Sequence, residues 1–143
     1  MIYTKNTLKA MKIAYDAHHG QVDKCGTPYI FHPIHLAEYM DTEEECIVAL
    51  LHDVVEDTDM TFDDLEKDFS SDIIAALKLL NKNKNDDYME YVKRIKHNDI
   101  ARKVKLADLT HNCDINRLNN VTEEDIKRHD KYREAIKLLN AKN

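Results

Sequence analysis

The chain has 143 residues, a length typical of one domain with its own hydrophobic core. Apolar residues make up 43% and charged residues 34% of the sequence, a balance that predicts a globular rather than a disordered protein. The net charge of -6 argues against a nucleic-acid-binding module, and no apolar run approaches the roughly 18 residues of a membrane span.

Helices account for nearly all of the predicted structure. Both glycines and both prolines fall between residues 20 and 33, so this window alone excludes a long helix. Hydrophobic periodicity and capping residues predict helices over 4–19, 33–40, 43–56, 61–69, 72–82, 86–97, 98–117 and 122–140. We therefore expect an all-α bundle of about eight helices, forming a single domain over residues 1–143.

Individual residues predict where these helices begin and which faces are buried. In the first helix, Leu8 and Tyr15 are among the residues expected to point inward. Pro33 suits the first position of its helix, where a missing N–H costs nothing. The run Thr42-Glu-Glu-Glu45 is a capping box that opens the next helix. In the last helix, the expected apolar positions begin with Ile126.

The run from Cys46 to Asp57 carries the first candidate site, because its apolar residues end abruptly in four ionisable ones. Buried charges are normally paired or bound to a metal. On one continuous helix, Asp53, Glu56 and Asp57 would share one side, with His52 at its edge. The histidine and first carboxylate suit a divalent cation, and the two later acids suit work on a water held by it. The alternative is an amphipathic helix whose last turn meets solvent.

Two further residues could complete a metal site. Asp108 interrupts an apolar stripe one turn after Val104, so it would face the bundle interior, where helical proteins build metal sites. The alternative is a carboxylate held by a neighbouring lysine or arginine. Among eight histidines, His32 directly precedes Pro33, which favours an extended backbone there. A set of two nitrogen and two oxygen ligands suits Mn²⁺, Fe²⁺ or Zn²⁺ better than Ca²⁺; its members would be His32, His52, Asp53 and Asp108.

The cysteines, the N-terminus and the basic residues bear on compartment and partners. Three widely spaced cysteines fit reduced thiols, and the first residues lack the apolar region of a signal peptide. We therefore expect a soluble cytoplasmic protein with neither a membrane nor a nucleic acid as partner. The favoured interpretation of one basic stretch is a solvated helix surface; it comprises Lys93, Arg94, Lys96, Arg102, Lys103 and Lys105.

Four ordered motifs carry a family resemblance. They are His18-His-Gly-Gln21, Gly26-Thr-Pro-Tyr-Ile-Phe-His-Pro33, Ala49-Leu-Leu-His-Asp-Val-Val-Glu-Asp-Thr58 and Val104-Lys-Leu-Ala-Asp-Leu-Thr-His-Asn112. The order of histidines and aspartates resembles that of HD-domain metal-dependent phosphohydrolases. The flanking residues are similar to the hydrolase domain of the RelA/SpoT family over about residues 10–140. We therefore expect an HD-domain helical bundle, as in the small single-domain alarmone hydrolases.

The resemblance implies an enzyme that removes the 3′-pyrophosphate from (p)ppGpp, giving GDP or GTP and pyrophosphate. It implies Mn²⁺, or another divalent transition metal, bound by the four residues His32, His52, Asp53 and Asp108. Glu56 and Asp57 match the acidic pair that positions or deprotonates the attacking water. Lys24 and Asn112 match residues that contact the phosphorylated nucleotide, and Arg117 is a further candidate for holding phosphate or nucleoside.

One residue departs from the family pattern and leaves alternatives open. Many alarmone hydrolases place an arginine just before the loop lysine, and here that residue is Asp23. An acid cannot stack on a base as arginine does, and it repels a polyanion. An HD phosphohydrolase for another nucleotide, such as a nucleoside phosphate or NADPH, is one alternative. A catalytically silent alarmone-binding module is another, although binding alone needs no water activator. No oligomeric state follows from the sequence.

Overall fold

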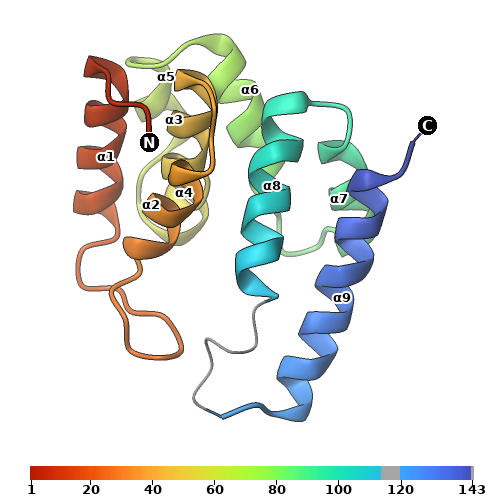
Figure 1. Cartoon of the computed structure of the whole chain (residues 1–143). Coiled ribbons are helices and arrows are strands. Elements are labelled where there is room, and N and C mark those ends of the chain that lie inside the picture. The colour runs from red at the N-terminus through yellow and green to blue at the C-terminus, as the bar shows by residue number, and fades with distance from the viewer. Residues whose placement is uncertain (114–119, 143) are drawn as a thin grey trace.

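The computed structural model describes residues 1–113 and 120–142, and this part of the chain is all-α, without a β-strand (Figure 1). The predicted fold class is confirmed. The only β-type pairing of the described residues is an isolated bridge between Val22 and Pro28. The described helices are α1 (Lys5–Ala17), α2 (Phe31–Glu38), α3 (Glu43–Leu51), α4 (Val54–Asp57), α5 (Phe62–Glu66), α6 (Ser71–Leu80), α7 (Tyr88–Ile95), α8 (Asp99–Asn112) and α9 (Glu123–Asn140).

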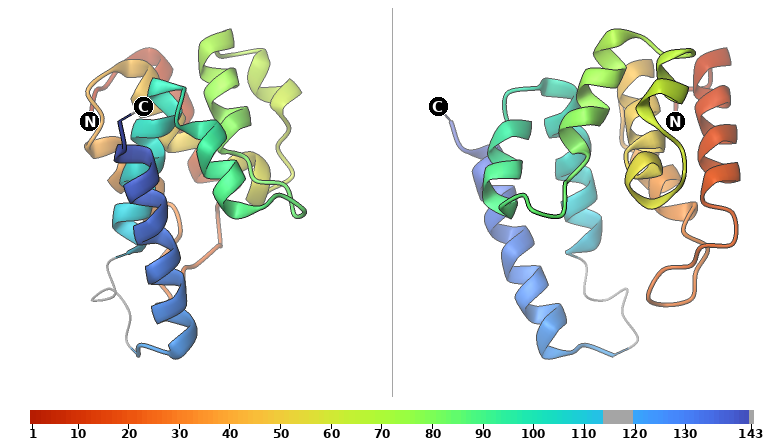
Figure 2. Two further views of the ribbon diagram at one scale, coloured as in Figure 1. Left: turned by 90° about the vertical axis from the view of Figure 1, so that its right-hand side faces the viewer. Right: turned by 180° about the vertical axis from the view of Figure 1, so that it is seen from behind.

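Helix α3 is the centre of the packing. It contacts α1, α2, α6 and α8, while α9 lies against α7 and α8 at the opposite edge of the molecule from α1 (Figures 1 and 2). All residues from Cys46 to Leu51 are buried, as expected of a helix that is apolar on every side. The capping box predicted at its start is present: the Thr42 hydroxyl accepts from the Glu45 N–H at 3.1 Å.

The helix predicted over 43–56 is two helices in the structure. Helix α3 ends at Leu51, and α4 begins only at Val54. Between them, His52 keeps helical angles (φ -59°, ψ -29°), but Asp53 has φ -107° and ψ 0°, the bridge region of backbone conformation. The prediction of one continuous helix was therefore wrong, and the break falls on the two residues that the motif singled out.

The prediction of an extended His32 was also wrong. Helix α2 begins at Phe31, so His32 is its second residue and Pro33 its third rather than its first. The His32 N–H donates to the Tyr29 carbonyl at 3.0 Å. The first N–H groups of a helix have no intrahelical partner, so a proline within the first turn is tolerated without loss of a hydrogen bond.

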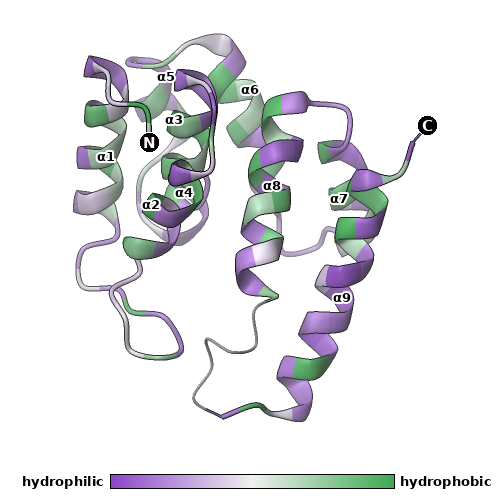
Figure 3. Ribbon diagram, in the orientation of Figure 1, coloured by the Kyte–Doolittle hydropathy of each residue, from purple (hydrophilic) through white to green (hydrophobic). Residues whose placement is uncertain are grey.

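The outer faces of the terminal helices differ from the prediction. Leu8 and Tyr15 are each 53% exposed, and Ile126 is 51% exposed. The buried face of α1 consists of smaller residues, Thr7, Ala10 and Ala14, which allow α1 and α3 to pack closely. Most residues of α9 are hydrophilic, as the colouring of its ribbon shows (Figure 3). Within the described part of the chain, no helix has the length and apolar content needed to cross a membrane.

We expect Leu50→Ala to lower the free energy of unfolding by about 2–5 kcal/mol, because the substitution deletes buried methyl groups and leaves a cavity. Leu50 is fully buried in α3. Leu8→Ala, on the exposed side of α1, should change stability by less than about 0.5 kcal/mol. Chemical denaturation followed by circular dichroism measures both variants. A similar loss for the two would contradict the burial described above.

Candidate functional site

The structure brings the four predicted metal ligands together from three parts of the fold. His32, His52 and Asp53 each offer a ligand atom within 4.8 Å of the others, which makes them a possible metal site. Asp108, on α8, adjoins this group. Its Oδ1 lies 2.9 Å from His32 Nε2 and 3.7 Å from His52 Nε2. Two imidazoles and two carboxylates thus line the interface between α2, α3 and α8.

The hydrogen bonding of His52 tests whether these residues fit a metal. Its Nδ1 lies 2.6 Å from the Ala49 carbonyl oxygen. A carbonyl only accepts, so Nδ1 carries a proton, and Nε2 is the ring nitrogen left for a metal ion or a second proton. This buried Nε2 has no hydrogen-bond partner among the described residues, although Asp53 Oδ2 is 2.9 Å away. A ring nitrogen and a carboxylate oxygen at this distance need a proton or a metal ion to bridge them, so the donor set can hold a divalent metal.

The charges around His52 agree with a cation site. Burial lowers the pKa of His52, but the Asp53 and Asp108 carboxylates raise it by more, so that the net shift is upward. A positive charge at Nε2 is therefore favoured by the surroundings, whether a proton or a metal ion supplies it.

Neighbouring side chains bind both oxygens of Asp108, and Oδ1 also faces the histidines. The Lys105 ammonium lies 2.9 Å from Oδ2, and the Asn112 amide donates to Oδ1 at 3.1 Å. Burial raises the pKa of Asp108, but Lys105 and the two histidines lower it well below its usual range. The carboxylate is therefore ionised, as a metal ligand must be. The alternative considered for Asp108, a carboxylate held by a neighbouring lysine, is thus also present, and the same carboxylate adjoins the candidate metal site.

The position of Lys105 corrects the interpretation of the basic stretch as a solvated surface. Only 14% of its side chain is exposed, and its ammonium pairs with Asp108 inside the fold. The spacing i, i+3 on one helix was a signal for this pair. The exposed Lys93 and Arg94 fit the original interpretation.

Tyr29 and His111 support the ligand cluster from outside and were missed by the sequence reasoning. The Tyr29 hydroxyl donates to Asp53 Oδ2, and burial followed by the charge of Asp53 raises the pKa of Tyr29. His111 Nδ1 lies 2.7 Å from His32 Nδ1, and the two rings stack with centroids 4.9 Å apart. Both residues lie three positions from a predicted ligand, Tyr29 before His32 and His111 after Asp108.

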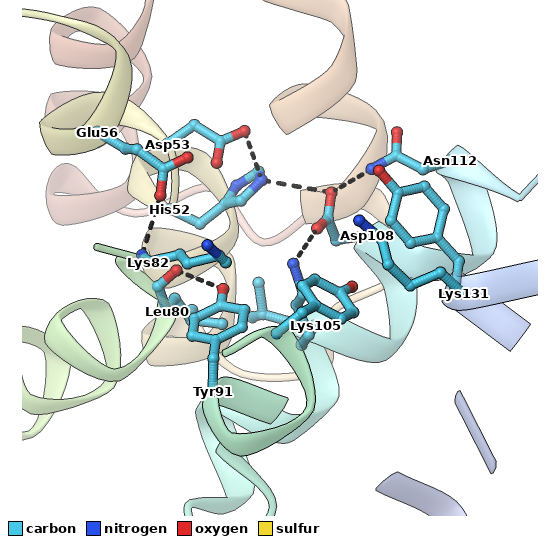
Figure 4. Close-up of a pocket in the computed structure, with 13 residues that line it drawn as sticks. His52, Asp53, Glu56, Leu80, Lys82, Tyr91, Lys105, Asp108, Asn112 and Lys131 are labelled. Carbon is cyan, nitrogen blue, oxygen red and sulfur yellow. Dashed lines mark hydrogen bonds and ion pairs between the residues drawn. The ribbon is translucent and has the colours of Figure 1, made fainter. Parts of the chain in front are cut away.

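The predicted acidic pair is divided between two hollows. Glu56 lines the same pocket as His52 and Asp53 (Figure 4), and its carboxylate accepts from the Lys82 N–H at 2.9 Å. Asp57 lines a neighbouring hollow beside Gln21 instead. Burial and the charge of Asp53 raise the pKa of both acids. A raised pKa suits a proton acceptor that works near neutral pH.

The pocket beside the ligand cluster has a volume of about 240 Å³. It lies between the cluster and helices α7 and α9 (Figure 4). Beyond the cluster and Glu56, its wall is rich in lysine and tyrosine; the remaining lining residues are Leu80, Lys82, Tyr88, Tyr91, Val104, Lys105, Asn112, Lys131 and Tyr132. The sequence reasoning found only Asn112 among these, because residues from three separate segments meet here. Cationic and aromatic groups suit a ligand with phosphates and a planar base.

The other predicted substrate-binding residues lie away from this pocket or cannot be placed. The ammonium of Lys24 lies 3.4 Å from Asp125 Oδ1 on α9, and Lys24 is not among the described lining residues. Arg117 lies outside the described residues. Asp23 shapes the loop: its Oδ1 accepts from the N–H groups of Cys25 and Thr27 at 2.8 and 3.0 Å.

Comparison with known proteins gives a family and several relatives. The family model described as HD domain matches residues 10–137. The bifunctional (p)ppGpp synthase/hydrolase SpoT of Escherichia coli is 34% identical over 123 residues, which cover 76% of this chain and 18% of the relative. A guanosine-3′,5′-bis(diphosphate) 3′-pyrophosphohydrolase of Spiroplasma citri is 33% identical over 124 residues, or 76% and 16% of the two chains. The chain thus spans less than a fifth of these curated relatives.

One solved structure matches the whole chain. It comes from work described as "A metazoan ortholog of SpoT hydrolyzes ppGpp and plays a role in starvation responses". The likeness has a TM-score of 0.81 at 25% sequence identity and covers 100% of this chain and 90% of the other. The resemblance inferred from the four motifs is confirmed by these matches.

We expect Asp53→Ala to abolish binding of Mn²⁺ and Glu56→Ala to retain it. The first substitution removes a ligand from the cluster, whereas Glu56 lies one turn further along and bonds to Lys82. Metal content after dialysis, measured by mass spectrometry, separates the two. The site would be misplaced if Asp53→Ala bound one equivalent of metal as tightly as the wild type.

We also expect Tyr29→Phe to weaken metal binding by about tenfold to a hundredfold, the usual effect of removing a partner that orients a ligand. The substitution deletes only the hydroxyl that donates to Asp53. Titration calorimetry with Mn²⁺ measures the change, and Tyr15→Phe on exposed α1 is the matched control. Equal affinity in Tyr29→Phe and in the control would rule out this supporting role.

Proposed function

Because the chain belongs to the HD domain family, we propose that it is a metal-dependent phosphohydrolase that removes the 3′-pyrophosphate from (p)ppGpp. The products would be GDP or GTP and pyrophosphate. The observation that carries the proposal is the cluster of two histidines and two aspartates opening into a pocket lined by lysines and tyrosines. The activities named for SpoT and for the metazoan protein support the choice of substrate.

We propose Mn²⁺ as the metal, with another divalent transition metal as the alternative, held by the four residues His32, His52, Asp53 and Asp108. Two observations support this assignment: His52 presents Nε2 to the two carboxylates while Nδ1 binds a carbonyl, and the pKa of Asp108 is lowered well below its usual range. When bound, a divalent metal polarises a phosphoryl oxygen and lowers the pKa of a water molecule.

The remaining polar residues have separate proposed roles. Glu56 would accept the proton of the attacking water, since its pKa is raised and it lines the pocket. Asp57 would act from the neighbouring hollow, through its charge on Asp53 and Glu56. Asn112 and Lys105 would hold Asp108 in place while they face the phosphates. Such fixed donors stabilise the charge that develops during phosphoryl transfer.

Lys24 and Arg117 complete the proposed substrate-binding set. The Lys24 ammonium forms a long ion pair with Asp125 at 3.4 Å, and 57% of the Lys24 side chain is exposed. The buried Asp125 also pairs with Arg128 at 3.1 Å, so a substrate phosphate could replace Asp125 as the partner of Lys24 without leaving the aspartate unpaired. Arg117 keeps its proposed role from the sequence, a contact with phosphate or nucleoside.

An HD phosphohydrolase for a different nucleotide is the second candidate, and Asp23 is the observation that favours it. Its carboxylate closes the loop by accepting from two backbone N–H groups. The planar cation that many alarmone hydrolases have at this position, an arginine, is therefore replaced by an acid. A panel of ppGpp, pppGpp, GTP, NADPH and nucleoside monophosphates with Mn²⁺ distinguishes the candidates. Release of pyrophosphate from ppGpp supports the first, and release of monophosphate from another member supports the second.

We expect Glu56→Ala to retain metal but to lower kcat by about 10²–10⁴-fold, the usual effect of removing a proton-transfer group. Because burial raises the pKa of Glu56, its basic form is lost as the pH falls through a value above the ordinary range of a glutamate. The wild-type rate should therefore decline on the acid side at that higher pH, and Glu56→Ala should lose this limb. A variant with near-wild-type kcat and an unchanged profile would show that Glu56 is only a helix end in solvent.

A further inference from the structure

The motif His18-His-Gly-Gln21 forms a fixed turn between α1 and the loop before α2. His18 is the residue that ends α1. Gly20 has φ 85°, a left-handed conformation that favours glycine after a helix. The Gln21 N–H donates to the His18 carbonyl at 3.0 Å, and the Gln21 carbonyl accepts from the Tyr29 N–H at 2.9 Å. These backbone bonds hold Gln21 close to His18.

The side chains of His18 and Gln21 form a chain of two hydrogen bonds that ends on α4. The Gln21 amide nitrogen donates to the Asp57 backbone carbonyl at 3.2 Å, so the amide oxygen is the atom that faces His18. This Oε1 lies 2.9 Å from His18 Nδ1. An amide oxygen only accepts, so Nδ1 carries the proton. Asp57, which lines the same hollow as Gln21, is therefore tied to the end of α1.

Helix α4 carries both acids and is too short to be stable alone. It has four residues, Val54–Asp57, and a single helical turn is not stable in isolation. Hydrogen bonds from two other segments reach it: the Lys82 N–H donates to the Glu56 carboxylate at 2.9 Å, and Gln21 donates to the Asp57 carbonyl. The position of each acid therefore depends on a contact from outside the helix.

The His18 ring also supports the metal-ligand side of the site. His18 is only 2% exposed, and its ring packs on the ring of Tyr29 with centroids 4.9 Å apart. Tyr29 in turn donates to Asp53. Burial lowers the pKa of His18 by more than the Gln21 bond and the charge of Asp53 raise it, so the ring is neutral. One neutral side chain thus contacts the partner of Asp53 and the partner of Asp57.

The second ring nitrogen of His18 shows that packing alone does not explain this residue. Its Nε2 is buried and has no hydrogen-bond partner among the described residues. A buried polar atom without a partner costs free energy, so an apolar ring would fill the same space at lower cost. What the histidine adds is the N–H at Nδ1 that holds Gln21.

We propose that His18 and Gln21 are positioning residues, which hold Asp57 at a fixed place relative to the metal ligand Asp53. This inference rests on the proposed function, in which Asp57 acts through its charge on Asp53 and Glu56. Gln21 fixes the acid, and His18 joins Gln21 to the Tyr29 ring on the ligand side. A displaced Asp57 would leave metal and substrate bound but would slow the reaction.

Steady-state kinetics, with the nucleotide of the panel that the protein hydrolyses, tests this role. Gln21→Met keeps the length of the side chain but loses both hydrogen bonds. It should lower kcat by about tenfold to a hundredfold, the cost of displacing a group near the reacting atoms, with little change in KM. His18→Phe should act in the same direction. His19→Phe is the matched control, because His19 is the adjacent and exposed histidine of the same motif.

A double-mutant cycle shows whether the effect passes through Asp57. In an Asp57→Asn background, Gln21→Met should lower kcat by less than about twofold, because the group that it positions is already neutral. The same fold loss of kcat in both backgrounds would indicate general destabilisation and would overturn the proposal.

Hydrogen exchange separates failure of the positioning role from failure of the proposed function, since it needs no substrate. The amides of Asp57 and Thr58 donate to the carbonyls of Asp53 and Val54 at 3.0 and 3.1 Å. Mass spectrometry of peptides from α4 should show about tenfold faster exchange in Gln21→Met, the effect of losing one hydrogen bond, and no change in His19→Phe. This result supports the proposal even if no nucleotide of the panel is hydrolysed. Unchanged exchange in Gln21→Met overturns it even if ppGpp is hydrolysed.

Discussion

Two carboxylates beside two imidazoles in the interior of a helical bundle are the constraint on which the site depends. Asp108 is buried and Asp53 partly so, and such charges are tolerated only where other groups compensate them. Lys105 and Asn112 bind Asp108, and Tyr29 donates to Asp53. The Nδ1 of His52 is bound to the Ala49 carbonyl, so its Nε2 is the nitrogen that faces the nearest carboxylate oxygens of Asp53 and Asp108. A cation at this point completes the compensation.

The helical framework has the arrangement that such a cluster requires. From Cys46 onward, helix α3 is apolar on all sides, and α3 packs against four neighbouring helices, so His52, the residue that ends it, is held rigidly. The chain then turns at Asp53 before α4 begins, and this turn directs the carboxylate to its own neighbour, His52, at 2.9 Å. Asp108 comes from α8, which packs directly on α3. The proposed metal ligands therefore lie in or beside helices that pack on one another, whereas Lys24 comes from the loop before α2.

Sequence reasoning succeeded where a pattern is local and failed where charges from separate segments meet. The all-α class follows from helical periodicity with breakers confined to residues 20–33, and the apolar stripe through Val104 located Asp108. The break at Asp53 left no such signal, since its neighbours are compatible with a continuing helix. The burial of Lys105 was missed because basic residues are usually solvated. Lys105 is buried here because its ammonium pairs with Asp108. Tyr88 and Lys131 are far apart in sequence, so no spacing indicates their contact.

The two walls of the pocket differ in charge. On one side, acidic residues and histidines favour a cation, and on the other, Lys82 and Lys131 favour an anion. Lys105 lines the same pocket and pairs with Asp108 at 2.9 Å. The loop before α2 carries Asp23 where many alarmone hydrolases have an arginine, and this acid is used to close the loop. Cationic and aromatic groups are instead present together on the pocket wall formed by α7 and α9.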